Sequence, residues 1–303
     1  MISYDPKEWF TFLFKIHKYE TFRQLLPLMI GVGVYSGLIA YIEIDSFISP
    51  ELKEQTKSIS TIFSILGFTL SLMLAFRTNS AYDRWWEGRK LWGDLTNSSR
   101  GFSAHINGIL KTADHQNRKI IAAHIACFAY ALRFHLKSEK MDREIIENEL
   151  DEPYLLDYRE LFNSANNQPV TIFKTLVNHI HQLNREGLIT PEQLYLLKPE
   201  LNKFIDVCGA CERIKSTPIP ISYAAFLKKF IFFYVMLFPL IYGMHMSYYI
   251  IPVTVFILYV LSSIELIAEE IEDPFSDSPN DLPTFKLAKG IAHGAKQILS
   301  TTL

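Results

Sequence analysis

The sequence predicts an all-α membrane protein with four membrane-spanning helices and a large helical cytosolic region. Two uncharged runs of 18 residues, Leu25–Ile42 and Ile59–Phe76, are long enough to cross a hydrocarbon core of about 30 Å as helices. Two further apolar stretches follow near the C-terminal end, Phe226–Met244 and Tyr248–Leu261. Between Trp85 and Ala225 no window is expected to be apolar enough to span, although apolar residues recur there at helical spacing.

Composition narrows the classes of function. The chain has 303 residues and a net charge of −2, which gives no general attraction for nucleic acid, so no nucleic-acid partner is expected. Its three cysteines cannot form a disulfide framework. We interpret Cys208 and Cys211 as small buried side chains on one helix rather than a redox or metal pair. Because the first apolar run begins near Leu25, we expect insertion by the chain's own helices and not by a cleaved signal.

The N-terminal part divides into an interfacial segment and two crossings. Residues 1–24 mix aromatic residues with Lys and Arg, which is typical of a segment lying at the membrane surface. Residues 25–76 contain membrane helices 1 and 2. The acidic stretch Glu43–Lys57, which includes the helix breaker Pro50, is predicted to link them.

The remaining chain is expected to return to the membrane once. Residues 77–225 form the cytosolic helical region, with boundaries near Asp114, at Glu152-Pro153, across Asn163–Pro169 and before Pro191. Residues 226–270 form membrane helices 3 and 4 as a hairpin, whose arms we expect Pro239 and Pro252 to kink. Residues 271–303 are a cytosolic C-terminal segment.

Charge on either side of the second crossing predicts the orientation. The flank that follows it is strongly basic, whereas the short loop that precedes it is acidic; the basic residues are Arg77, Arg84, Arg89 and Lys90. Cytoplasmic flanks carry an excess of Lys and Arg in multispan proteins. We therefore expect a multi-pass protein of the cell's inner (plasma) membrane with both termini in the cytoplasm.

Two stripes run along the second apolar helix. One carries only small residues, Ser60, Ser64, Gly67, Ser71 and Ala75, and suits close helix packing. The other is mixed in polarity, as expected beside a narrow passage that contains water, and comprises Thr61, Ile65, Thr69 and Met73. On the pattern alone, ordinary helix–helix contacts in a membrane bundle are favoured for both stripes over a pore lining, because small residues, Ser and Thr are common at any membrane helix interface. A pore would require symmetric copies of the chain, because one such helix cannot enclose it.

No pattern predicts a catalytic centre, a cofactor or a metal ion. His124 and His135 lie three helical turns apart, and His179 and His181 point to different faces of a helix. The sequence contains no nucleophile elbow and no glycine-rich phosphate loop. The loop Asp273–Asp281 has few acids and is interrupted by prolines, so an ordered loop without metal is favoured over a calcium site.

The charged and aromatic block Arg77–Arg89 follows the second apolar run directly. It is too rich in ionisable residues for a simple aromatic belt. Two interpretations stay open: a paired network that holds the helix rigid, or a charged vestibule wall beneath a pore.

Three segments together resemble the bestrophin family in its bacterial branch. They are FRTNSAYDRWWEGRKLWG (76–93), GACERIKSTPIPISY (209–223) and AEEIEDPFSDSPNDLP (268–283), within a similarity that spans residues 20–285. The resemblance implies a homopentameric ion channel with one axial pore, four membrane helices per subunit and a large helical cytosolic domain.

The resemblance also implies where the pore narrows. Counted from the F-R-x-N segment, the family's neck falls on Ile65, Thr69 and Met73, with Thr61 one turn outward. Thr69 interrupts the family's apolar neck. A shift of one residue would place Ser64 and Phe68 there instead.

A second constriction in the family lies on the cytosolic side. The same kind of counting places it near Glu192, where five carboxylates would favour cations. The animal calcium clasp has a nearly continuous acidic run after the Pro-Phe pair, of which only Asp277 and Asp281 remain here. Calcium gating is therefore not expected.

The predicted function is passive conduction of small monovalent ions across the lipid bilayer. The family name indicates chloride, whereas bacterial members resemble it in fold and can pass monovalent cations, and no fixed charge in this neck decides between them. Two other classes stay open. One is a non-conducting membrane scaffold, which needs only the oligomer, and the other is a membrane-bound helical enzyme, which needs a polar catalytic cluster.

Overall fold

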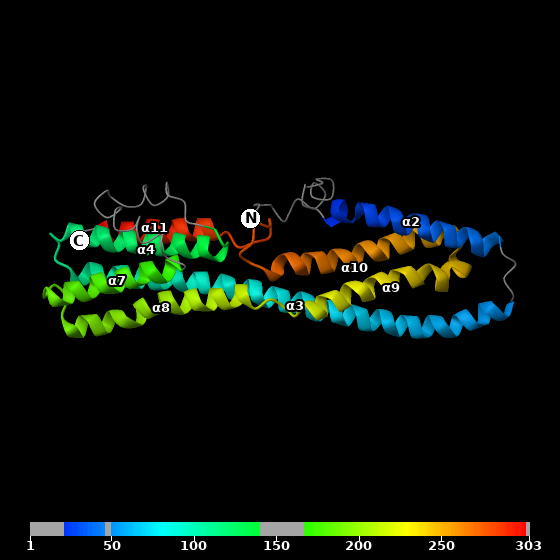
Figure 1. Ribbon diagram of the computed structural model, residues 1–303, viewed down its shortest axis with the longest axis horizontal. Coiled ribbons are helices and arrows are strands. Elements are labelled where there is room, and N and C mark those ends of the chain that lie inside the picture. Colours follow the sequence, from blue (N-terminus) through cyan, green and yellow to red (C-terminus); the bar gives the residue numbers. More distant parts are fainter. Residues whose placement is uncertain (1–20, 46–49, 140–166, 301–303) are drawn as a thin grey trace. The chain divides into compact units, whose positions relative to one another are not determined.

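The computed structural model describes residues 21–45, 50–139 and 167–300 (Figure 1). Every regular element within these ranges is a helix, which confirms the predicted all-α class. The chain forms two compact units. The first, here the membrane unit, consists of the described residues within Met1–Trp85, Pro218–Asp273 and Ser278–Asn280; the second, here the α4 unit, consists of those within Trp86–Thr217, Pro274–Asp277 and Asp281–Leu303.

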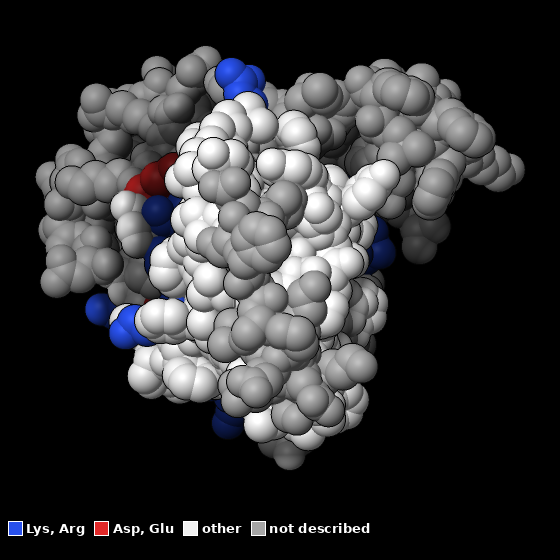
Figure 2. Space-filling view, turned by 90° about the vertical axis from the view of Figure 1, so that its right-hand side faces the viewer, with Lys and Arg blue, Asp and Glu red and all other residues white. Residues whose placement is uncertain are grey.

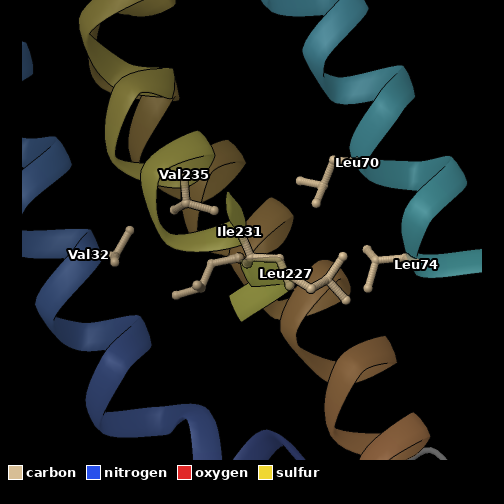
Figure 3. Close-up of a cluster of buried hydrophobic side chains, with 7 residues drawn as sticks. Val32, Leu70, Leu74, Leu227, Ile231 and Val235 are labelled. Carbon is tan, nitrogen blue, oxygen red and sulfur yellow. The ribbon is translucent and has the colours of Figure 1, made fainter. Parts of the chain in front are cut away.

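The membrane unit is built from four long helices. They are α2 (Thr21–Asp45), the first part of α3 (Pro50–Ile109), α9 (Ile221–Met246) and α10 (Ile250–Glu272), with a 3₁₀ turn at Ser247–Tyr249. Their apolar side chains meet in one core (Figure 3), which consists of Val32, Leu70, Leu74, Leu227, Ile231, Val235 and Leu258. All four helices supply a member, so the core ties them into one bundle.

The surface of the membrane unit is apolar. Large hydrophobic side chains are exposed on all four helices, including Ile30, Val34, Phe68, Phe233 and Phe256. Described residues in the foreground of Figure 2 are almost all uncharged, and Lys and Arg lie toward the margins of the view. Such a surface suits contact with lipid or with further apolar helices.

Helix boundaries agree with the sequence prediction in most places and differ in two. Pro50 does not break a helix; α3 begins there, because proline is favoured at the first helical position, where no N–H partner is needed. Pro252 likewise lies in the first turn of α10 and does not kink it, whereas Pro239 does lie inside α9. Residues 1–20, where an interfacial segment was predicted, lie outside the described residues, as does the boundary at Glu152-Pro153.

Candidate membrane spans also include one helix that the sequence analysis did not expect. Thr21–Glu43, Ile59–Ile109 and Ile221–Glu272 contain strongly apolar windows that are only 17–28% buried, and the last of these holds both α9 and α10. The fourth, His115–Leu136, is α4, with a mean hydropathy of 1.2. The expectation that residues between Trp85 and Ala225 include no window apolar enough to span a membrane is therefore wrong, because α4 meets the requirement in length and hydropathy. Because 83% of the α4 window is buried inside its own unit, we assign α4 to a protein core.

The α4 unit surrounds that buried helix with α7 (Gln168–Arg185), α8 (Pro191–Ser216), α11 (Thr284–Ser300) and the second part of α3. Phe204 of α8 contacts Phe102 of α3, with 6.2 Å between ring centroids, and Phe128 of α4, with 5.2 Å. Caps confirm the three predicted boundaries that lie within the described residues. Asp114 caps α4, Asn167 caps α7, and Thr190 forms a capping box with Gln193 at the start of α8.

Two histidines that are far apart in the sequence stack in this core. The rings of His124 on α4 and His179 on α7 are nearly parallel, with centroids 5.9 Å apart. His124 Nδ1 donates to the carbonyl oxygen of Ile120 at 2.7 Å. Burial lowers the pKa of His124 to about 4 and also lowers the pKa of His179.

We expect this pair to make folding stability depend on pH. The folded-state pKa of His124 lies below that of an unfolded chain, so the unfolded state binds the proton first. The contribution of His124 to the free energy of unfolding is fully present above about pH 6.5. It is lost as the pH falls toward about 4, and the total loss is about 3 kcal/mol. Thermal unfolding of the detergent-solubilised protein at a series of pH values measures this loss. His124→Gln should reduce the slope, whereas His293→Gln, a change on the exposed face of α11, should leave it unchanged.

Candidate functional site

The candidate site is the outer face of the apolar part of α3. Its inner face is a stripe of buried residues at helical spacing, Phe63, Leu70, Leu74, Arg77 and Ala81, which packs within the membrane unit. Residues on the opposite side remain open in the single chain, among them Ile65, Phe68 and Leu72, with exposed fractions of 61%, 72% and 46%. The chain therefore leaves one face of this helix for lipid or for other subunits.

The predicted neck residues lie mostly on that open side. Thr61, Ile65 and Thr69 are exposed, whereas Met73 is half-buried and packs against the apolar core of its own unit. The difference follows from helix geometry, because a row with four-residue spacing turns by about 40° at each step. In the alternative register, Ser64 Oγ lies 3.4 Å from Tyr242 Oη of α9, so it faces its own chain.

The hydroxyl groups along this part of α3 bond to their own helix. Thr69 Oγ1 donates to the carbonyl oxygen of Ile65 at 3.0 Å, and Ser71 Oγ donates to that of Gly67 at 2.9 Å. A hydroxyl whose proton is engaged in this way offers its oxygen lone pairs to a passing species. Thr69 therefore presents an acceptor rather than a donor.

Small residues of α3 make room for two tyrosines of α9. Gly67 lies against Tyr234, whose ring stacks on Phe63 with 4.3 Å between centroids. Tyr242 Oη lies within 3.4 Å of the Ser60 carbonyl oxygen. The small stripe is thus a packing surface in its first half, as predicted, but it accommodates aromatic side chains and not a neighbouring backbone.

We expect Gly67→Ala to lower the stability of the membrane unit. A Cβ at this position would lie 2.5 Å from Tyr234 Oη, so the stacked ring would have to move. Such overpacking costs about 1–3 kcal/mol. Gly31→Ala on α2 is the matched control, because a Cβ there meets nothing within 4 Å. Melting temperatures in detergent that fall equally for both variants would contradict the packing role of Gly67.

At the end of the apolar part of α3, a buried ion-pair network supports the helix. Arg77 is 2% exposed, and its Nη2 lies 2.6 Å from Oε2 of Glu272. Its Nε lies 3.6 Å from Oε2 of Glu265, which is also 2% exposed. Arg84 Nε donates to the carbonyl oxygen of Glu272 at 3.0 Å. Of the two interpretations of the Arg77–Arg89 block, the paired network is the arrangement found at these residues.

The sequence pattern does not predict the partners of Arg77, because they lie on α10, far along the chain. Glu265 and Glu272 are seven residues apart, and that spacing is the one available signal that they share a helix face. A further contact supports the neck itself: Tyr223 Oη, at the start of α9, donates to the Met73 carbonyl oxygen at 2.9 Å.

Glu192, the predicted cytosolic aperture residue, lies in the first turn of α8 and is exposed. Hydrogen bonds from its own backbone N–H and from the Thr190 side chain lower its pKa. The side chain is therefore a carboxylate at neutral pH.

The remaining candidates for chemistry are structural. Cys208 and Cys211 are buried, as predicted, and burial is the main cause that raises the pKa of Cys208 to about 12, so it stays a thiol at neutral pH. Among the described residues, no group of three or more His, Cys, Asp and Glu side chains could hold a metal ion. The loop after α10 is closed by its own hydrogen bonds, including Ser276 Oγ to Asp281 Oδ2 at 2.9 Å.

Comparison with known proteins gives a consistent picture. The model of a family described as bacterial/fungal bestrophin protein matches residues 1–297. The voltage-dependent anion channel-forming protein sll1024 of Synechocystis sp. is 36% identical over 220 residues, which cover 72% of this chain and 70% of that protein. The corresponding protein alr2987 of Nostoc sp. is 32% identical over 224 residues, 72% of this chain and 71% of its own. A crystal structure of a bacterial bestrophin homolog from Klebsiella pneumoniae superimposes with a TM-score of 0.76 at 25% identity, covering 90% of this chain and 99% of that one.

Proposed function

The chain belongs to the family of bacterial and fungal bestrophin proteins, and on that premise we propose that it forms a homopentameric channel for small monovalent ions. The observation that carries the proposal is the unpartnered face of α3. It is held rigidly by an apolar core on one side and by the Arg77 network at its end, yet its other side, with Ile65 and Thr69, has no partner within the chain's described residues.

Five copies of this face around one axis would enclose a narrow pathway. Ile65, Thr69 and Met73 line it, with Thr61 one turn outward. A wall of this kind offers few ligands to an ion, so conduction depends on whether water fills the constriction. Met73 would complete the lining with the part of its half-buried side chain that stays exposed, and the hydrogen bond from Tyr223 Oη to its carbonyl oxygen supports the helix there.

Selectivity follows from the charges and dipoles along the pathway. The two relatives from Nostoc sp. and Synechocystis sp. are named anion channel-forming proteins, which points to anions as the permeant ions. The chain's own groups favour cations, because the Thr69 hydroxyl presents an acceptor and Glu192 presents a carboxylate. We propose that five copies of Glu192 line the cytosolic aperture and set a preference for monovalent cations.

Placement in the inner membrane, with both termini in the cytoplasm, is part of the same proposal. Arg84, Arg89 and Lys90 follow the second crossing closely, and such a basic flank stays on the cytoplasmic side. The family and its relatives point to an ion channel rather than an enzyme.

Current recording of the purified protein in a planar bilayer under a KCl gradient tests the proposal. Discrete currents are expected, and the sign of the reversal potential gives the permeant ion. Glu192→Gln should shift the reversal potential toward that of chloride. Silence under all conditions would contradict conduction. Thr69→Trp currents equal to those of the wild type would contradict conduction through the proposed neck, since a non-conducting scaffold tolerates a bulky residue there without any change in ion flux.

A further inference from the structure

Three side chains form the centre of the buried network at the end of the neck helix, those of Arg77, Glu265 and Glu272. With both carboxylates ionised, these three side chains carry a net charge of −1, while Arg84 Nε contacts the backbone carbonyl oxygen of Glu272. Arg77 and Glu265 are each 2% exposed, so solvent does not screen their charges. An uncompensated buried charge is costly, and such groups take up a proton or a counter-ion.

The two carboxylates differ in their hydrogen bonds. Both oxygens of Glu272 have strong donors: Arg77 Nη2 lies 2.6 Å from Oε2, and the Ile219 N–H donates to Oε1 at 2.6 Å. These bonds favour the ionised form. By contrast, neither oxygen of Glu265 accepts a hydrogen bond from any described residue, and its contact with Arg77 Nε, at 3.6 Å, is too long for one.

The other charged groups near Glu265 do not supply a hydrogen bond to its carboxylate. Lys228 of α9 is the second cation that acts on it, but Lys228 Nζ donates to both oxygens of Glu269, at 2.9 and 2.8 Å. The acidic groups that face it are Glu269 and Glu272 of its own helix. Of the carboxylates in this network, Glu265 is thus the one that is buried and accepts no hydrogen bond from the described residues.

We propose that the Arg77, Glu265 and Glu272 cluster is a proton-binding site in which Glu265 takes up the proton, and that its occupancy sets the conductance of the neck. Arg77 lies one helical turn beyond Met73, so the cluster fixes the rotation of the neck helix where its lining ends. With Glu265 protonated, the cluster is neutral and Arg77 pairs with Glu272 alone. When Glu265 loses the proton, Arg77 is drawn toward it, and the neck helix turns with it.

The first experiment compares the currents of the wild type and two variants in planar bilayers. It rests on the proposed function, because it requires that the protein conducts. Wild-type current should change several-fold between acid and alkaline pH, because the cluster is neutral when Glu265 holds the proton and carries a net negative charge when it does not. Glu265→Gln, which mimics the protonated side chain, should show the acid-form current at every pH. Glu270→Gln, a change on the same helix at a carboxylate that accepts a hydrogen bond from Asn280 Nδ2 at 2.7 Å, should keep the wild-type response. A wild-type current that is flat with pH, or a Glu265→Gln protein with the wild-type response, would overturn the proposal.

A second measurement addresses the proton site without conduction. Infrared difference spectra of the detergent-solubilised protein between acid and alkaline pH should contain a carbonyl band of a buried protonated carboxylic acid. The band should be absent in Glu265→Gln and shifted in Glu265→Asp. Channels that are silent while this band is present would contradict the proposed function and support the proton site; a spectrum in which all three proteins share the same bands would overturn the site.

Discussion

Ile65→Ala is expected to raise the unitary conductance several-fold. The substitution removes three carbons from each copy of a side chain that is 61% exposed in the single chain and that we place at the narrowest part of the pathway. A wider and less obstructed constriction admits water more readily, and conduction through an apolar neck depends on wetting. Single-channel recording at symmetric KCl measures the effect directly.

The matched control is Ile30→Ala on α2. Ile30 has almost the same exposed fraction, 60%, but belongs to a helix for which no role in the pathway is proposed. The unitary conductance of the Ile30→Ala channel should equal that of the wild type. Phe68→Ala addresses the alternative register in the same way. A rise for Phe68→Ala without a rise for Ile65→Ala would place the neck one residue away from its proposed position.

Arg77→Met should be the most destabilising single change in the membrane unit. It leaves Glu265 and Glu272 without their shared cation, and removal of one partner from a buried ion pair costs about 3–5 kcal/mol. We expect a large fall in melting temperature in detergent and a reduced yield of assembled protein. The double variant Arg77→Met with Glu265→Gln should recover part of the loss, because it removes the carboxylate that has no other donor.

Arg213→Met serves as the comparison for Arg77→Met. Arg213 pairs with Glu87 at 2.6 Å, but both side chains are largely exposed, at 67% and 41%. Exposed ion pairs contribute about 0–1 kcal/mol. Equal losses of stability for the two arginine variants would contradict the distinction between a buried network and a surface pair.

The helices could be predicted from the sequence because their signals are local. Long apolar stretches marked α2, α3, α9 and α10, and capping residues such as Asp114 and Thr190 marked the starts of α4 and α8. Prolines were less informative, since Pro50 and Pro252 each lie in the first turn of a helix where a break or a kink was expected. Proline has both effects, and its position relative to the first turn decides between them.

The site was harder to predict because its parts come from different helices. The open face of α3 was visible in its pattern, but the contact of Met73 with its own core depends on how α9 and α10 pack. The pairing of Arg77 with Glu265 and Glu272 joins residues almost 200 positions apart, and no local pattern links them. The stack of His124 on His179 was also not predictable, because it joins side chains of two helices, α4 and α7, that no local pattern links.

Cysteine accessibility tests the central claim, that several copies place the open face of α3 around an ion pathway. The native cysteines at 127, 208 and 211 are all buried, so the wild-type protein supplies a low background for a charged, water-soluble thiol reagent. Single cysteines at Ile65 and Thr69 should be modified from the aqueous side, with loss of the current through the planar bilayer. Ile30→Cys should keep its current under the same treatment. Full current after treatment of both the Ile65→Cys and Thr69→Cys proteins would show that this face of α3 meets lipid and does not line the pathway.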